Sequence, residues 1–298
     1  MRVAISGASG LIGTALHKEL AARGYEFVPL VRRQALPGEV EWNPAEHLEP
    51  GKLSSCDAVV HLSGKNIAGR WTERFKRDVY NSRVESTRTL ANAAAESFRR
   101  SRKPQMFLSA SAIGYYGDRG DELLTESSPP GKAGLSPELV LAWEAATAPA
   151  SEASLRVANL RFGVVLAAQG GALQKMLPAF RLGLGGQIGN GQQYLSWISL
   201  DDVVGTILLT LQNDSLRGAV NIVAPNPVRN AEFTETLGHV LGRPTLLPVP
   251  AFLVRLLFGQ MGDELLLASQ RVEPSKLKAA GYQFRHAELR EALRAVLA

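Results

Sequence analysis

The sequence contains little cysteine: Cys56 is the only one among 298 residues. A single cysteine excludes an internal disulfide and a cysteine-rich metal site, and we expect no metal centre. Because Cys56 is soon followed by the apolar residues Ala58, Val59 and Val60, we predict a buried, unreactive thiol. A hydrophobic core must therefore stabilise the chain, and its hydrophobic content of 45% is sufficient for one.

Long apolar runs are absent too, and no segment is long enough to span a membrane. A strand begins at residue 3, which leaves no room for a signal peptide, so we expect a cytoplasmic protein. The net charge is +5, but the basic residues are scattered. Their one dense cluster, Arg99–Lys103, follows a helical pattern, as a solvated helix end does. We therefore expect neither a nucleic acid nor a membrane as a partner.

A glycine-rich turn stands at the start of the sequence. The apolar run Val3–Ser6 leads into Gly7, Gly10 and Gly13, and an amphipathic segment overlaps the last of these glycines. This pattern predicts a buried strand that turns sharply into a helix. Gly7 would permit the turn, Gly10 would let a pyrophosphate approach the backbone, and Gly13 would let helix and strand pack closely. Because the helix N-terminus offers free N–H groups to phosphates, we predict a dinucleotide site.

Strand and helix patterns alternate through the first half of the chain. This alternation predicts an α/β fold with a parallel, doubly wound sheet of the Rossmann type. Amphipathic patterns predict helices over Thr72–Arg99 and Pro137–Ala148. The strands are expected at 25–31, 39–42, 57–62, 105–111 and 155–162.

The pattern changes after Gly163. Residues 182–191 are rich in glycine and predict a mobile loop, and prolines separate short helical stretches from residue 225 onward. We therefore assign 1–165 to a dinucleotide-binding Rossmann domain. Residues 166–298 are assigned mainly to a smaller, mostly helical substrate lobe, with 199–224 returning to the Rossmann domain.

The end of the second strand indicates which dinucleotide is bound. An acidic residue at this position bonds the ribose hydroxyls of NAD(H), whereas arginine accepts the 2′-phosphate of NADP(H). Here the strand runs into Arg32 and Arg33, with no acidic residue before Glu39. The sequence therefore favours NADP(H), the alternative being two solvent-facing arginines in a loop.

Several motifs resemble the extended short-chain dehydrogenase/reductase superfamily, which includes sugar-nucleotide epimerases and dehydratases. They are GASGLIG at 7–13, VVHLSG at 59–64, LSASAIGYYG at 108–117 and SWISLDDVV at 196–204. More narrowly, the chain is similar to a divergent branch usually called epimerase family proteins. The motifs of this branch are YNSRVEST at 80–87, AWE at 142–144, GGQIGNGQQYLSWISLDD at 185–202 and PSKLKAAGYQFRH at 274–286.

The resemblance implies a Rossmann fold, bound NADP(H) and a set of cofactor-binding residues. Those for the pyrophosphate would be Gly7, Ser9, Gly10, Leu11, Ile12 and Gly13. The 2′-phosphate would be held by Arg32 and Arg33, and the adenosine side would be lined by Leu62, Ser63 and Gly64. Ser109, Ala110 and Ser111 would lie beside the nicotinamide. Arg83 stands where the superfamily often has an asparagine facing the sheet, with an exposed helix arginine as the alternative.

The catalytic pattern of the superfamily is incomplete in this chain. Its oxidoreductases use a tyrosine with a lysine four residues later, because the ammonium group lowers the pKa of the phenol. At the corresponding positions this sequence has Ser136 and Val140. A serine that orients the substrate oxygen is available as Ser111, with Ser109 as the alternative.

Tyr115 and Tyr116 follow the fifth strand and are the candidates to replace the missing phenol, with simple packing as the alternative. Glu144 is either a base or a helix-surface or capping residue, and the latter is favoured. His61, inside an apolar strand, is expected to be a hydrogen-bonded core residue. Asp202 matches an aspartate of the superfamily, and we expect a structural role for it.

These observations lead to two functional hypotheses. The first is an NADP(H)-dependent oxidoreductase or epimerase that acts on a small carbonyl or hydroxyl compound between the two lobes. The second is a non-catalytic NADP(H)-binding sensor, favoured by the missing tyrosine–lysine pair. The sugar-nucleotide enzymes that the chain resembles commonly have an arginine near the glycine-rich loop to bind the diphosphate. Between Leu184 and Val204 there is no arginine or lysine, which argues against a nucleotide-sugar substrate. The resemblance also implies a homodimer through the two long helices, an arrangement that is common in the superfamily.

Overall fold

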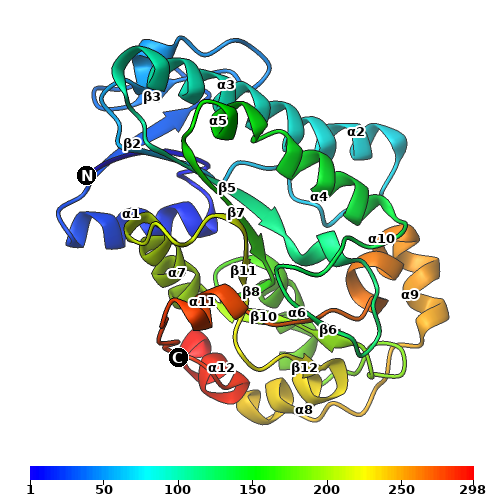
Figure 1. Ribbon diagram of the computed structural model, residues 1–298. Helices are drawn as coiled ribbons and strands as arrows, with labels where there is room; N and C mark the ends of the chain where they lie inside the picture. Colours follow the sequence, from blue (N-terminus) through cyan, green and yellow to red (C-terminus); the bar gives the residue numbers. More distant parts are fainter.

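The computed structural model describes residues 1–298, and a parallel sheet of seven strands lies at its centre (Figure 1). The strand order is β11-β7-β5-β4-β1-β2-β3, so the chain reverses its direction of travel across the sheet between β1 and β4. The strands are β1 Arg2–Ser6, β2 Glu26–Val31, β3 Val40–Glu41, β4 Ala58–His61, β5 Met106–Ala112, β7 Arg156–Phe162 and β11 Gly218–Ile222. The predicted α/β fold with a doubly wound parallel sheet is confirmed.

Helices cover both faces of this sheet, which explains why its strands are apolar on both sides. Leu16 of α1 and Ile207 of α7 pack against one face, and Leu90 and Phe98 of α3 pack against the other. In Figure 1, α3, α4 and α5 lie on the opposite side of the sheet from α1 and α7. These helices are α1 Leu11–Ala22, α3 Val84–Ser101, α4 Leu135–Ala145, α5 Ala148–Glu152 and α7 Leu200–Gln212.

The C-terminal part forms a second layer of short helices with a core of its own, which contains Leu173, Trp197, Phe233 and Leu293. Because β11 pairs with β7, the segment around α7 and β11 belongs to the central sheet. The remaining helices are η1 Pro50–Leu53, α2 Glu73–Asn81, η2 Ile113–Tyr116, α6 Gly171–Arg181, α8 Asn230–Leu241, α9 Ala251–Phe258, α10 Gln260–Gly262, η3 Asp263–Leu267, α11 Ser275–Ala279 and α12 Leu289–Leu297. The short strands are β6 Leu123–Leu124, β8 Val164–Leu166, β9 Tyr194–Leu195, β10 Trp197–Ser199, β12 Val228–Arg229 and β13 Arg271–Val272.

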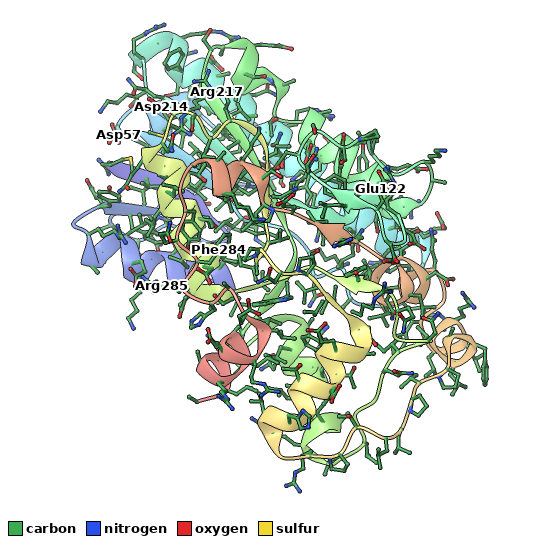
Figure 2. All side chains as sticks on the ribbon, turned by 60° about the horizontal axis from the view of Figure 1, so that its bottom comes forward. Asp57, Glu122, Asp214, Arg217, Phe284 and Arg285 are labelled. Carbon is green, nitrogen blue, oxygen red and sulfur yellow. The ribbon has the colours of Figure 1, made fainter.

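The fully buried carboxylate of Asp202 joins the last part of the chain to the Rossmann sheet. It accepts hydrogen bonds from the backbone N–H groups of Arg285 and His286, at 2.8 and 3.0 Å. The hydroxyl of Tyr282 also donates to it, at 3.1 Å. Figure 2 shows Phe284 and Arg285 beside α1 and α7, on the side of the sheet that these helices cover. The structural role expected of Asp202 is confirmed.

Two helices differ from the prediction. The single helix expected over Thr72–Arg99 is interrupted between α2 and α3 at Ser82 and Arg83, so that prediction is wrong. The Ser82 hydroxyl donates to Val79 O and accepts from the N–H of Lys65, and such side-chain bonds compete with helix continuation. The helix expected over Pro137–Ala148 is likewise divided into α4 and α5.

The glycine-rich segment 182–191 is a loop without regular structure, as predicted, but hydrogen bonds attach it to a neighbouring segment. The N–H of Val249 donates to Gln187 O at 2.8 Å, and Gly189 donates to Val249 O at 2.9 Å. Cys56 is buried, and burial raises the pKa of its thiol, which confirms the expected unreactive cysteine.

His61 is buried within β4 and is neutral in the folded protein, because burial lowers its pKa to about 3. The Ser6 hydroxyl donates to Nδ1 at 2.5 Å, and Nε2 lies 3.1 Å from the Ser86 hydroxyl. Since Ser86 donates its own proton to Ser82 O, Nε2 carries the hydrogen of the ring. The expected core histidine is confirmed.

His61 should therefore make stability pH-dependent. Between its unfolded pKa of 6.5 and its folded pKa of about 3, the unfolded state binds more protons, so the free energy of unfolding falls as the pH falls. From pH 7 to pH 5 this contribution is about 2 kcal/mol. In urea unfolding, the free energy of unfolding of His61→Gln should therefore fall by about 2 kcal/mol less between pH 7 and pH 5 than that of the unaltered protein. An equal pH dependence in both proteins would contradict the prediction.

Candidate functional site

The glycine-rich turn lies where the carboxyl ends of β1 and β4 diverge, the usual ligand-binding crevice of an open α/β sheet. Gly7 has a φ of +73°, and a Cβ there would lie 2.8 Å from the carbonyl group of Leu62. A Cβ on Gly13 would lie 2.3 Å from Gly7 O. The turn expected of Gly7 and the close packing expected of Gly13 are thus both observed.

The N-terminus of α1 is free to bind an anion. Its N-cap is Gly10, and no side chain accepts a hydrogen bond from the N–H groups of the first turn, which includes Leu11 and Ile12. The one close neighbour of a Cβ on Gly10 would be Gly7 O, at 3.2 Å, so the outer side of the turn is open. The free N–H groups and the open side of the turn fit the phosphates of a dinucleotide. The groove of about 670 Å³ that borders Ser9 and Gly10 runs between α1 and α7, past Glu19 and Asp201, and does not include the end of β4.

Of the two arginines that follow β2, one is paired with an acidic residue and the other is not. The Arg33 guanidinium bonds both carboxylate oxygens of Glu39, at 2.6 and 2.7 Å. This hydrogen bonding raises the pKa of Arg33 and lowers that of Glu39. Arg32 is exposed and forms no ion pair within the protein. Only Arg32 is therefore free for a 2′-phosphate without breaking an existing contact.

Arg83 is neither exposed nor paired with an acid. Its guanidinium lies 5.2 Å from the ring centre of Trp143, and a Cβ on Gly64, after β4, would lie 3.5 Å from it. Its hydrogen bonds, to Val79 O and to the Ser82 hydroxyl, are both 3.4 Å long. Burial lowers its pKa to about 10. The alternative of a solvated helix arginine is wrong, and a positive charge without a carboxylate partner lies next to the end of β4.

At the end of β5, Ser111 joins a buried ion pair that sequence reasoning missed. Arg161 of β7 donates to the Glu144 carboxylate of α4 through Nε and Nη2, at 2.7 and 2.8 Å. The Ser111 hydroxyl donates to the same carboxylate at 2.6 Å. Burial alone would lower the pKa of Arg161, but its contacts with Glu144 raise it above the ordinary value. The prediction of a surface or capping role for Glu144 is therefore wrong.

The other serine and its neighbour lie inside the sheet. Ser109 is completely buried and its hydroxyl donates to the backbone oxygen of Ala110, while Ala110 is also buried and packs against Trp143. Neither side chain offers a free polar group to a ligand, so Ser109 does not serve as the alternative orienting serine. Leu62, Ser63 and Gly64 are partly or fully exposed at the end of β4, where the cofactor was expected.

The two candidate tyrosines have different environments. Tyr116 is completely buried, and its hydroxyl contacts Asn221 at 2.7 Å and Arg161 at 3.0 Å. Burial raises its pKa, so a catalytic role for Tyr116 does not fit the structure. Tyr115 is half-buried, its ring centre lies 3.4 Å from the Arg161 guanidinium carbon, and its hydroxyl forms no hydrogen bond within the protein. Tyr115 is therefore the tyrosine available to a ligand.

Ser136 occupies the position expected for the catalytic tyrosine, near the N-terminus of α4. Its hydroxyl is buried and has no hydrogen-bond partner. The carboxylate of Glu264, from η3, accepts the backbone N–H groups of Leu135 and Ser136 at 3.0 and 2.7 Å and so caps α4. The sequence offers a signal for Arg161, a charge inside an apolar strand, but none for Glu264, which is far away along the chain.

The fold and this site define a dinucleotide-fold protein of the epimerase type. Residues 3–223 match the model of the NAD dependent epimerase/dehydratase family, and residues 249–296 match a domain of unknown function, DUF1731. The chain belongs to the NAD dependent epimerase/dehydratase family, and its resemblance to epimerase family proteins is confirmed.

Three known proteins illustrate this similarity. The chain is 43% identical to epimerase family protein Mb2239 of Mycobacterium bovis, over 98% of this chain and 96% of the relative. It is 38% identical to human epimerase family protein SDR39U1 in a crystal structure with NADPH, with 99% of both chains covered and a TM-score of 0.89. A nucleoside-diphosphate sugar epimerase from Corynebacterium glutamicum is 37% identical, with a TM-score of 0.81, and all of this chain aligns with 58% of it.

Removal of one partner of the buried ion pair should lower the free energy of unfolding. Arg161→Met leaves the Glu144 carboxylate without its counter-charge and should lower the free energy of unfolding by about 3 kcal/mol. Removing both charges, with Arg161→Met and Glu144→Leu together, should recover most of this loss. Urea unfolding at pH 7 measures both effects.

The matched control is the exposed pair of Arg88 and Glu85 on α3. Arg88→Met should change the free energy of unfolding by less than about 0.5 kcal/mol, because water screens this pair. Equal losses for Arg161→Met and Arg88→Met would show that burial of the first pair has no energetic consequence.

Proposed function

We propose that this protein binds NADP(H) and uses it in an oxidoreductase or epimerase reaction on a small carbonyl or hydroxyl compound. The observation that carries the proposal is the uncapped N-terminus of α1 behind Gly10, at the reversal point of the sheet. Human SDR39U1, which is similar over the whole chain, was crystallised with NADPH. When bound, this cofactor supplies or accepts a hydride.

Arg32, which has no acidic partner, supports NADP(H) over NAD(H). At the end of β2 it would hold the 2′-phosphate, and Arg33 would join it only by releasing Glu39. Arg83, between α2 and α3, would face either cofactor beside Gly64. No acidic residue stands at the end of β2 to bond the ribose hydroxyls, since Glu39 is engaged with Arg33.

Proton transfer is assigned to Tyr115. Its hydroxyl is free, and stacking of its ring on Arg161 holds the side chain in place. Ser111 has a different role from the predicted one: its proton already goes to Glu144, so none is left to donate to a carbonyl oxygen. It therefore positions the Glu144 carboxylate.

The second candidate function is a sensor that binds NADP(H) without turnover. Ser136 and Val140 favour it, because both are buried at the positions where a tyrosine and a lysine would transfer the proton. The two candidates share the cofactor site and differ in whether Tyr115 takes part in chemistry.

Cofactor titration tests the shared part of the proposal. The protein should bind NADPH more tightly than NADH, measured by cofactor fluorescence. Arg32→Ala should weaken NADPH binding about tenfold, or about 1.4 kcal/mol, and leave NADH unchanged, because only NADPH carries the 2′-phosphate. Arg99→Ala, on the exposed end of α3, is the matched control and should change neither affinity. Equal binding of both cofactors by the unaltered protein would overturn the choice of NADP(H).

Catalysis is tested by NADPH oxidation at 340 nm with a panel of aldehydes and ketones. Tyr115→Phe should lower kcat about 100-fold, a typical loss for a general acid, and leave the Kd for NADPH unchanged. Tyr80→Phe, a change at an exposed tyrosine of α2, should retain full activity. Tight NADPH binding without turnover of any compound in the panel would favour the sensor.

A further inference from the structure

Exposed apolar side chains are concentrated on one part of the surface. Eight of the twelve large hydrophobic residues that are exposed belong to the segments 182–184, 246–247 and 252–258. We call these three segments the apolar patch. Leu246 is 82% exposed and Leu256 is 77% exposed. Single exposed leucines are ordinary, but such a concentration marks an interaction surface.

The three segments are neighbours in space. Backbone hydrogen bonds join Gln187 and Gly189 to Val249, so the loop after α6 runs beside the segment that leads into α9. A Cβ on Gly183 would lie 3.5 Å from Pro244, which brings the beginnings of the two segments together. In Figure 1, α9 lies at the edge of the molecule, with no further element on its outer side. Val254 is the only buried residue of this helix.

The net charge around the apolar patch is positive. The sequence has no acidic residue in 153–200 or in 236–262, which contain all three segments. The exposed charges beside the apolar side chains are Arg181, Arg243 and Arg255, together with one acid, Asp263. Arg255 bonds Asp263 at 2.8 Å, whereas Arg181 and Arg243 have no acidic partner.

We propose that the apolar patch docks on a lipid bilayer that carries anionic headgroups. Leucine and phenylalanine would enter the boundary between headgroups and acyl chains, and Arg181 and Arg243 would face the headgroup phosphates. No helix of this protein is long and apolar enough to cross a membrane, and docking on a surface requires none. The sequence-based expectation of no membrane partner rested on the absence of a spanning segment and on basic residues that are scattered along the chain. The fold brings the segments of Arg181 and Arg243 together beside the patch.

Two other occupants fit less well. In a two-fold dimer the same patch would face itself, which would bring the unpaired arginines of both copies to one interface. A protein partner is less favoured because the patch consists of leucine and phenylalanine without tyrosine or tryptophan, and leucine is under-represented among the residues that dominate protein interfaces.

Docking would also determine where the candidate site lies relative to the bilayer. From α9 the chain passes through α10 into η3, where Glu264 caps α4 beside the buried Ser136. The bilayer would therefore lie against the same helical segment that borders the site.

Flotation with lipid vesicles tests the proposal on the full chain. The protein should float with vesicles of phosphatidylcholine containing 30% phosphatidylglycerol, about tenfold more than with phosphatidylcholine alone, because the arginines add electrostatic attraction. The triple variant Phe252→Ser, Leu256→Ser and Leu257→Ser should lower the bound fraction at least tenfold, since it removes the inserted side chains. Arg181→Ser with Arg243→Ser should abolish the preference for anionic vesicles.

The control is Leu36→Ser, a change at an exposed leucine outside the patch, which should float like the unaltered protein. Circular dichroism and NADPH titration establish that each variant is folded. Absence of flotation with anionic vesicles, or equal flotation of the triple variant, would overturn the proposal. A dimer in solution that the triple substitution dissociates, without vesicle binding, would assign the patch to a second copy instead.

Discussion

The buried ion pair between Arg161 and Glu144 is the interaction on which the rest of the site depends. It joins β7 to α4, and it fixes Ser111, Tyr115 and Tyr116 through direct contacts with one of its two charges. Because both charges are largely removed from water, neither can lose its partner without a large energetic cost. The site thus has a rigid, charge-balanced edge at the end of β5 and β7. Tyr115, which is half-buried, leaves its hydroxyl free for a ligand there.

The opposite edge of the crevice is positively charged and is not balanced by acidic side chains in the same way. Three positive groups near the ends of β1, β2 and β4 lack acidic partners: the uncapped helix end of α1, the exposed Arg32 and the half-buried Arg83. An anionic ligand would supply the missing partner charge. Phosphates are therefore expected at one end of the crevice and a neutral reacting group at the other. This division agrees with the absence of basic residues between Leu184 and Val204.

Two carboxylates tie the C-terminal segment to the Rossmann sheet. Asp202 accepts N–H groups from residues 285 and 286, and Glu264 accepts N–H groups from residues 135 and 136. Each ionised carboxylate satisfies backbone donors that would otherwise lack partners. Asp202 was expected to be structural from its motif, whereas the partners of both residues became apparent only in three dimensions. Figure 2 places Asp57, Asp214 and Arg217, which precede their strands, away from Arg285.

The sequence by itself determined the order of strands and helices, the glycine-rich turn and the site at its end, because these depend on local patterns of apolar residues and glycines. The resemblance to the superfamily predicted Ser136 and Val140 at the positions of the tyrosine–lysine pair. Only the tertiary structure decided the partner of each charge. It paired Arg33 with Glu39, left Arg32 free, placed Glu144 against Arg161 and exposed one face of α9. Pairing and exposure depend on which residues far apart in the chain meet in the fold, and no local pattern encodes that.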